Sequence, residues 1–212
     1  MRWHKPASWH ERSGHLPLSQ LTDSPGFGDP AALLRVYVAK APPMAEFAAL
    51  EHCVALLPGQ IDQIYQHCGN GWRKVFNVYA KLVWALPAPW QPDVHGALSW
   101  QQWRDQWLLQ AGSATVLLFG QTGFAASDCG IDTIHIIAGR QHARDLLAQG
   151  LLPDTWTGGL VWLDDEFAVA KRVRLVVCPY LDYRQLSDVK IARLVRLIRQ
   201  WPMNSGRLGA AE

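Results

Sequence analysis

Short, continuous apolar runs alternate with helical segments in the second half of the chain, and this pattern constrains the fold most. Residues 115–119 read TVLLF and residues 133–138 read TIHIIA. Runs of this length without polar alternation are typical of strands covered on both faces. A helical pattern over 140–149 follows the second run directly. The sequence therefore predicts an α/β fold with a mostly parallel sheet and helices on both faces, in a Rossmann-like, three-layer arrangement.

The first half of the chain is expected to be rich in helices. A strand over 33–40 comes first, because β-branched and aromatic residues are bounded there by prolines. Apolar residues then recur at helical spacing. The expected helices cover 43–57, 60–68, 71–86 and a segment after Ser99, where Ser99 and Gln102 are spaced as a capping box. Further strands are expected at 160–163 and 169–178, and a final helix over 188–201.

Turn-forming residues dominate the beginning of the chain. Residues 1–32 are rich in Pro, Gly, Ser and His, and include Ser24-Pro25-Gly26 and Gly28-Asp29-Pro30. We expect an irregular arm over 1–32 and a single α/β domain over 33–212. A chain of 212 residues can bury roughly 70% of its unfolded surface in such a domain.

The composition favours a cytoplasmic protein without a bound metal or cofactor. The first fifteen residues contain no apolar run that could serve as a signal sequence. No uncharged apolar stretch reaches the ~18 residues needed to span a bilayer, so no membrane partner is expected. The 4 cysteines are scattered, which fits reduced thiols better than a disulfide framework. No motif indicates a metal or cofactor, and the oligomeric state stays open.

Three loops follow predicted strand ends, and a parallel sheet would bring them to one rim. Ligands of such sheets bind at the carboxyl ends of strands. Glycines in the first loop allow a ligand close to the backbone, or they shape a tight connection. No catalytic residue is identified. The candidate ligand-binding residues are Gly120, Gln121, Thr122, Gly123, Phe124, Gly139, Arg140, His142, Pro179, Tyr180 and Asp182.

The last quarter of the chain is basic. Cations recur along the final helix, and they could form a phosphate-binding surface or an ordinary solvated helix face. The candidate phosphate contacts are Arg184, Lys190, Arg193 and Arg196. The acidic sequence Asp164-Asp165-Glu166 is interpreted as a solvated turn rather than a cation site, and His135 as a structural histidine within a strand.

The three loops resemble the strand ends of uracil-DNA glycosylases. FGQTGF at 119–124 is similar to that family's strand ending in Gly-Gln-Asp-Pro-Tyr, and IIAGRQHA at 136–143 to its strand followed by Trp-Gly-x-x-Ala. VVCPYLDYRQLS at 176–187 is similar to a strand ending in His-Pro-Ser before a Leu-bearing loop and a helix. The resemblance covers 115–201. It implies that superfamily's fold and a base-sized pocket with Phe124 as a stacking face.

The departures from this family remove its chemistry. Thr122 stands where the family places its water-activating Asp, and Cys178 where it places its electrophilic His. Gly123 and Phe124 replace a Pro and a Tyr. Without the carboxylate and the imidazole, water activation and leaving-group stabilisation are both missing. Uracil excision is therefore not expected.

Three functions remain open from the sequence. In the first, the protein binds nucleic acid or a nucleotide at the strand-end rim. In the second, it is an enzyme acting on a small phosphorylated or nucleoside-like metabolite, oriented by Gln121, Thr122 and His142. In the third, it is an interaction protein whose partner meets the helical half, because the chain contains 11 tryptophans. Most of these tryptophans are expected to fill the core.

Overall fold

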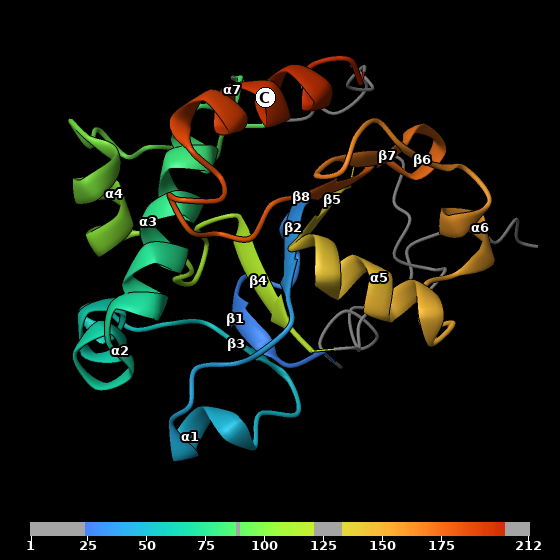
Figure 1. Cartoon of the computed structure of the whole chain (residues 1–212). Helices are drawn as coiled ribbons and strands as arrows, with labels where there is room; N and C mark the ends of the chain where they lie inside the picture. The colour runs from blue at the N-terminus through green and yellow to red at the C-terminus, as the bar shows by residue number, and fades with distance from the viewer. Residues whose placement is uncertain (1–23, 88–89, 121–132, 202–212) are drawn as a thin grey trace, which may run out of the picture.

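An eight-stranded mixed sheet forms the centre of the protein in the computed structural model, which describes residues 24–87, 90–120 and 133–201 (Figure 1). The strands lie in the order β3-β1-β4-β2-β5-β8-β7-β6. Their bounds are β1 Gly26–Gly28, β2 Leu34–Val38, β3 Cys53–Val54, β4 Thr115–Phe119, β5 Ile134–Ala138, β6 Leu160–Trp162, β7 Ala168–Ala170 and β8 Leu175–Cys178.

The four central strands run parallel. Val36 of β2 pairs with Leu117 of β4 on one side and with Ile136 of β5 on the other, and β8 continues the parallel ladder beside β5. The strands that flank this group, β1 and β7, run antiparallel to it. The predicted α/β class with a mostly parallel sheet is confirmed. The chain visits β2, then β4 on one side, then β5 on the other, which creates a topological switch point beside β2.

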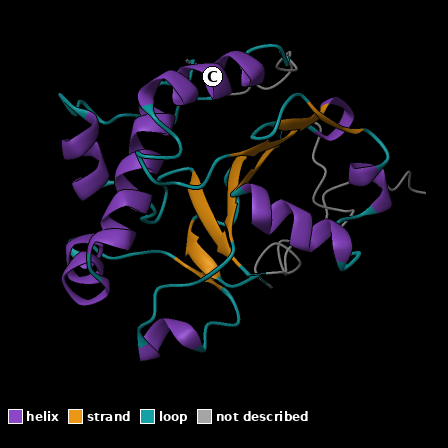
Figure 2. Ribbon diagram, in the orientation of Figure 1, coloured by secondary structure: helices purple, strands orange, loops and turns teal. Residues whose placement is uncertain are grey.

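Helices cover both faces of the sheet (Figure 2). Their bounds are α1 Ala45–Ala48, α2 Gln60–Cys68, α3 Asn70–Trp84, α4 Trp100–Gln106, α5 Arg140–Ala148, α6 Asp154–Thr157 and α7 Asp188–Ile198. Alternate strand residues point to opposite faces. Val36 and Ile136 therefore pack into one core with α3 and α7, whereas Tyr37 and Ile137 pack into a second core with α5 and α6.

Local signals set the ends of several helices. Gly69 follows α2 at φ 71°, a conformation that favours glycine, and its N–H donates to the carbonyl of Tyr65 at 2.8 Å. At the start of α4, the Ser99 hydroxyl accepts from the Gln102 N–H at 3.2 Å. The Gln102 side chain in turn accepts from the Leu98 N–H at 2.9 Å. The expected capping box is thus present, with its return bond one residue earlier.

The predicted helix over 43–57 is wrong. Only α1 is helical there, and Cys53 and Val54 form β3 in parallel with β1. The edge of β1 presents backbone N–H and C=O groups, and Cys53 and Val54 pair with them as a strand. This pairing prevails over the helix that the spacing of the apolar residues predicts. The short helix α6 was also not predicted.

The arm expected over 1–32 is wrong at Gly26–Gly28, which form β1 against β4. A Cβ at Gly26 would lie 2.6 Å from the Leu117 carbonyl oxygen, and one at Gly28 would lie 2.1 Å from that of Thr115. Glycine is therefore required where this backbone crosses β4. Gly26 and Gly28 look like turn formers in the sequence. They are strand residues in the sheet because a side chain at either position would clash with β4.

The single strand expected over 169–178 is also wrong. The segment divides into β7, a 3-10 turn at Lys171–Val173 and β8, and the two strands pair antiparallel. Arg174 reverses the chain direction at φ 49°. No glycine or asparagine marks this turn, so the sequence presents one continuous strand pattern.

The tryptophans that the structure describes are all buried or half-buried. Trp103 and Trp156 are fully buried, one in each core. No flat exposed tryptophan patch exists within the described residues, which argues against the interaction hypothesis in its simplest form. Trp3 and Trp9 lie outside this part of the chain.

The described helices are short. Even α3, with 15 residues, is amphipathic and has one face on the sheet. Across residues 24–87, 90–120 and 133–201, no helix has the length and apolar character that crossing a membrane would require.

Tyr79 connects α3 to the sheet, and its replacement should measurably weaken the fold. Its ring is fully buried, and its hydroxyl donates to the Val116 carbonyl at 2.9 Å. We expect Tyr79→Phe to lower the free energy of unfolding by about 1–2 kcal/mol, because a buried carbonyl loses this donor. Urea denaturation measures the change. Tyr183→Phe, at an exposed ring, is the matched control and should change stability by less than about 0.5 kcal/mol. Equal losses in both variants would contradict the assignment.

Candidate functional site

The carboxyl ends of β4, β5 and β8 meet at one rim. Nε2 of His142, on α5, lies 3.0 Å from the carbonyl oxygen of Gly120, which follows β4. The N–H of Gly139, which follows β5, donates to the carbonyl of Cys178 at 2.9 Å. A Cβ on Gly139 would lie 3.7 Å from the ring of Tyr180, which follows β8. Gly120, Gly139 and Tyr180, each from one of the loops expected at the strand ends, therefore lie close together.

Gly139 shapes the start of α5. Its φ of 111° lies in the region that favours glycine, and it sits between the side chains of His142 and Tyr180. The N-cap position of α5 is Gly139, which has no side chain to accept from the first-turn N–H groups of this helix. The N–H groups of its first turn have no acceptor within the helix, so they are left for solvent or a ligand.

His142 is held in one orientation and offers one unused nitrogen. His142 is only 6% exposed to solvent. Because Nε2 faces a carbonyl oxygen, Nε2 carries the proton and Nδ1 is left as an acceptor. In the part of the chain that the structure describes, this buried Nδ1 has no hydrogen-bond partner.

Burial keeps the imidazole of His142 neutral. Desolvation lowers the pKa of His142 from its ordinary value of 6.5, while the Gly120 carbonyl and the charge of Asp145 act more weakly in the opposite direction. At neutral pH the site therefore presents a buried acceptor rather than a cation.

Cys178 has no reactive role in this geometry. It is fully buried at the end of β8, and its thiol donates to the Pro179 carbonyl at 3.3 Å. Burial raises the pKa of Cys178 far above its ordinary value, so the sulfur stays protonated. The position that resembles an electrophilic histidine thus holds an inert thiol.

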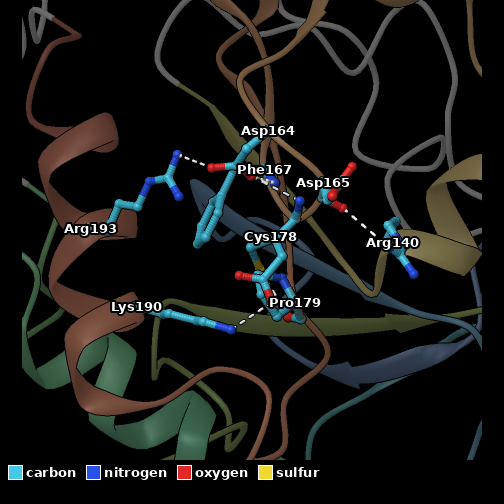
Figure 3. A network of polar contacts seen from close by, with 9 residues as sticks. Arg140, Asp164, Asp165, Phe167, Cys178, Pro179, Lys190 and Arg193 are labelled. Atoms are coloured by element: carbon cyan, nitrogen blue, oxygen red, sulfur yellow. Dashed lines mark hydrogen bonds and ion pairs between the residues drawn. The ribbon is translucent and has the colours of Figure 1, made fainter.

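An acidic turn of three residues, Asp164–Glu166, lies across the rim between α5 and α7 (Figure 3). Arg193 reaches Asp164 with Nη2 to Oδ2 at 2.5 Å, and Lys190 reaches Glu166 with Nζ to Oε1 at 2.6 Å. Arg140 of α5 donates to the Asp165 carbonyl at 3.3 Å. Two of the predicted phosphate contacts are therefore already neutralised by carboxylates of the same chain.

Asp164 also holds this turn in shape. Its Oδ1 accepts from the N–H groups of Glu166 and Phe167 at 2.8 and 2.9 Å. The hydrogen bond from the Glu166 N–H has the largest effect on the pKa of Asp164 and lowers it. Partial desolvation raises this pKa by less, and the Phe167 N–H and Arg193 lower it further. The Arg193 guanidinium stacks on the Phe167 ring, 4.3 Å from its centre.

Asp182 is tied to α3. Its Oδ2 accepts from Lys74 Nζ at 2.8 Å, and its Oδ1 from the Arg184 N–H at 2.9 Å. Partial burial raises the pKa of Asp182. The hydrogen bond and charge of Lys74, together with the N–H and the charge of Arg184, outweigh this effect, so the pKa is lowered. This carboxylate is thus an anchor of the loop after β8 and is occupied by a cation.

Only one of the other two predicted phosphate contacts lies near the rim. Arg184 is exposed beside Tyr183, 5.9 Å from its ring centre. Arg196 lies two turns along α7 from its first residue, about 12 Å away by helical rise. Arg184 is therefore near the rim and Arg196 is not.

Several predicted residues fall outside the described part of the chain: Gln121, Thr122, Gly123 and Phe124. His135 is a structural residue, as interpreted from the sequence. It is fully buried on β5, with Nδ1 2.9 Å from the Tyr37 hydroxyl. In the described ranges, no group of three or more His, Cys, Asp or Glu side chains is placed to hold a metal ion.

The acidic turn is the part of the rim that sequence reasoning missed. Its charges were visible, and so were those of Lys190 and Arg193 on the final helix. What the sequence does not show is that β7 turns back along β8, which carries this turn to the carboxyl end of β8.

A family model covers residues 25–199, which include the whole described sheet and the rim. The chain belongs to the family of unknown function DUF6942. No curated protein and no solved structure matches the chain.

The buried imidazole should make the stability of the protein sensitive to mild acid. The unfolded chain has the ordinary histidine pKa of 6.5 and the folded chain a lower one, so the unfolded state binds more protons between these values. Stability should be full above pH 6.5 and be lost as the pH falls through the folded-state pKa. We expect His142→Gln, which stays neutral, to flatten this part of the profile in urea denaturation at a series of pH values.

A matched control separates His142 from the other histidines. His52→Gln, at an exposed position, should retain the slope of the unmodified protein. If the His142→Gln profile runs parallel to that of the unmodified protein, His142 is not the residue responsible.

Proposed function

We propose that the rim around Gly120, Gly139, His142 and Tyr180 binds a nucleotide or a segment of nucleic acid, without excising a base. The observation that carries this proposal is the neutral, buried imidazole of His142, which Gly120 orients and whose Nδ1 is unpaired. A buried acceptor without a donor costs about 1–3 kcal/mol. A ligand N–H or O–H at this position would offset that cost, and nucleobases and ribose both provide such donors.

The surroundings of His142 suit the other parts of a nucleotide. Tyr180 lies half-buried against Gly139 and offers an aromatic ring for stacking. The uncapped first turn of α5 offers backbone N–H groups and the positive end of the helix dipole to a phosphate. Arg140, the first residue of α5, and Arg184 are exposed cations close by.

The same residues argue against glycosylase chemistry. A relationship to the uracil-DNA glycosylase-like superfamily belongs to this proposal, and the parallel central strands and the closeness of Gly120, Gly139 and Tyr180 support it. Yet Cys178 is a buried thiol where that family has its histidine, and Thr122 replaces the activating carboxylate. Binding without that reaction is the consistent proposal. A cytoplasmic location belongs to it as well, since Cys53, Cys68 and Cys178 are free thiols.

Removal of the Arg140 side chain tests the phosphate part of this site. We expect Arg140→Ala to weaken binding of a labelled single-stranded oligonucleotide several-fold at low salt. It should also reduce the slope of log affinity against log salt by about one, because one phosphate contact is lost. Fluorescence anisotropy measures both. Arg172→Ala is the matched control, since Arg172 is an exposed cation in the turn before β8, at the opposite end of that strand.

The ligand class is decided by running mononucleotides alongside the oligonucleotide. Binding of mononucleotides alone would favour the metabolite enzyme over a nucleic-acid protein. Absence of binding by both probes at low salt would overturn the proposed function. Equal weakening by Arg140→Ala and Arg172→Ala would place binding somewhere other than the rim.

Release of the cations from the acidic turn should strengthen binding of a polyanion. The double variant Asp164→Asn with Glu166→Gln removes the charges that neutralise Arg193 and Lys190. We expect tighter oligonucleotide binding and a salt slope steeper by about two, one for each released cation. The double variant Asp154→Asn with Asp62→Asn, at exposed carboxylates on α6 and α2, controls for the change in net charge. Unchanged affinity and slope in the double variant would show that these cations do not contact the ligand.

A further inference from the structure

The outer face of α7 is apolar in its middle and charged towards both ends. Its exposed residues, in chain order, are Asp188, Val189, Ala192, Arg196 and Arg199. Their spacing places them on one side of the helix. Val189 is 78% exposed, which is unusual for a large aliphatic side chain on a helix that otherwise packs into the core.

Two adjoining grooves follow this face, with volumes of about 300 and 530 Å³. Both are lined by Ala85, just beyond α3, and by Ala192 of α7. Trp100 of α4 extends the first groove, and Val189 and Val195 line the second. The small alanines at the shared centre leave room for another helix to approach closely.

Charged side chains on this face can form further ion pairs. The Asp188 side chain is 79% exposed and accepts from Lys81 through Oδ1 only, at 2.9 Å. Within the described residues, the side chains of Arg196 and Arg199 form no ion pair or hydrogen bond. A carboxylate therefore stands one turn before Ala192, and an unpaired guanidinium stands one turn after it.

We propose that this face binds a second copy of the chain, with the two α7 helices antiparallel about a two-fold axis at Ala192. In such a contact each residue meets the one equally far from the axis on the other copy. Asp188 then meets Arg196 in both directions, and Val189 of each copy lies over the second groove of the other copy, which the largely buried Val195 lines. The charge pattern of one helix face is thus complementary to itself, and the proposal is independent of ligand binding at the rim.

Other occupants fit this face less well. A nucleic acid would be repelled by Asp188 and would gain little from Val189. An acidic peptide would match Arg196 and Arg199 but would oppose Asp188. With 11 residues in α7, the contact area lies at the low end for specific interfaces, so the dimer should form reversibly, with a dissociation constant on the order of micromolar.

A charge exchange between two variants tests the register. Asp188→Arg should be monomeric, because the introduced arginine meets Arg196 of the other copy. Arg196→Asp should also be monomeric, because the introduced aspartate meets Asp188. An equimolar mixture of the two should form a dimer, since both contacts then pair opposite charges. Sedimentation velocity over a concentration series measures the association of the unmodified protein, each variant and the mixture.

Further variants separate this contact from unfolding and from other dimers. Ala192→Glu should abolish association through steric and charge conflict at the axis, whereas Arg172→Asp should leave it unchanged. Circular dichroism and thermal unfolding check that each variant is folded. A monomeric unmodified protein at every concentration would overturn the proposal. So would a dimer that survives Ala192→Glu, or a mixture of the charge variants that stays monomeric.

Discussion

The structure depends on the parallel pairing of β4, β2, β5 and β8. Each of these strands has a partner on both sides, so its backbone groups are satisfied within the sheet and its side chains are covered by helices on both faces. Parallel strands must end on the same side of the sheet. This single constraint brings Gly120, Gly139 and Pro179 to one rim, although they lie far apart in the sequence.

Electrostatic balance at this rim comes from ion pairs between segments that lie apart in the chain. Lys190 and Arg193 of α7 are paired with carboxylates of the acidic turn between β6 and β7, and Asp182 is paired with Lys74 of α3. A polyanion must therefore compete with carboxylates already present. The uncharged acceptor of His142 is different in kind, since burial keeps it neutral and selects for a donor. The rim thus combines one uncharged hydrogen-bond acceptor, on His142, with two cations, Lys190 and Arg193, that carboxylates of the same chain neutralise.

Much of the fold could be predicted from local pattern, and the failures share one cause. The helices α2, α3, α4 and α7 and the strands β2, β4 and β5 follow from apolar spacing and end signals. The helix expected over 43–57 failed because β1 needed a partner strand at its edge. The strand expected over 169–178 failed because Arg174 turns the chain without glycine. In both cases strand pairing, of β3 with β1 or of β7 with β8, decided the local conformation.

The sequence by itself determined the α/β class and which residues follow the central strands, because these depend on residue spacing and residue identity. Only the tertiary structure decided which polar groups are used and which are free. Lys190 and Arg193 look like phosphate contacts in the sequence, yet the turn at Asp164–Glu166 pairs them, while His142 gains significance through burial against Gly120. Ion pairing and desolvation arise from contacts between segments that are remote in the chain, so the order of residues alone does not reveal them.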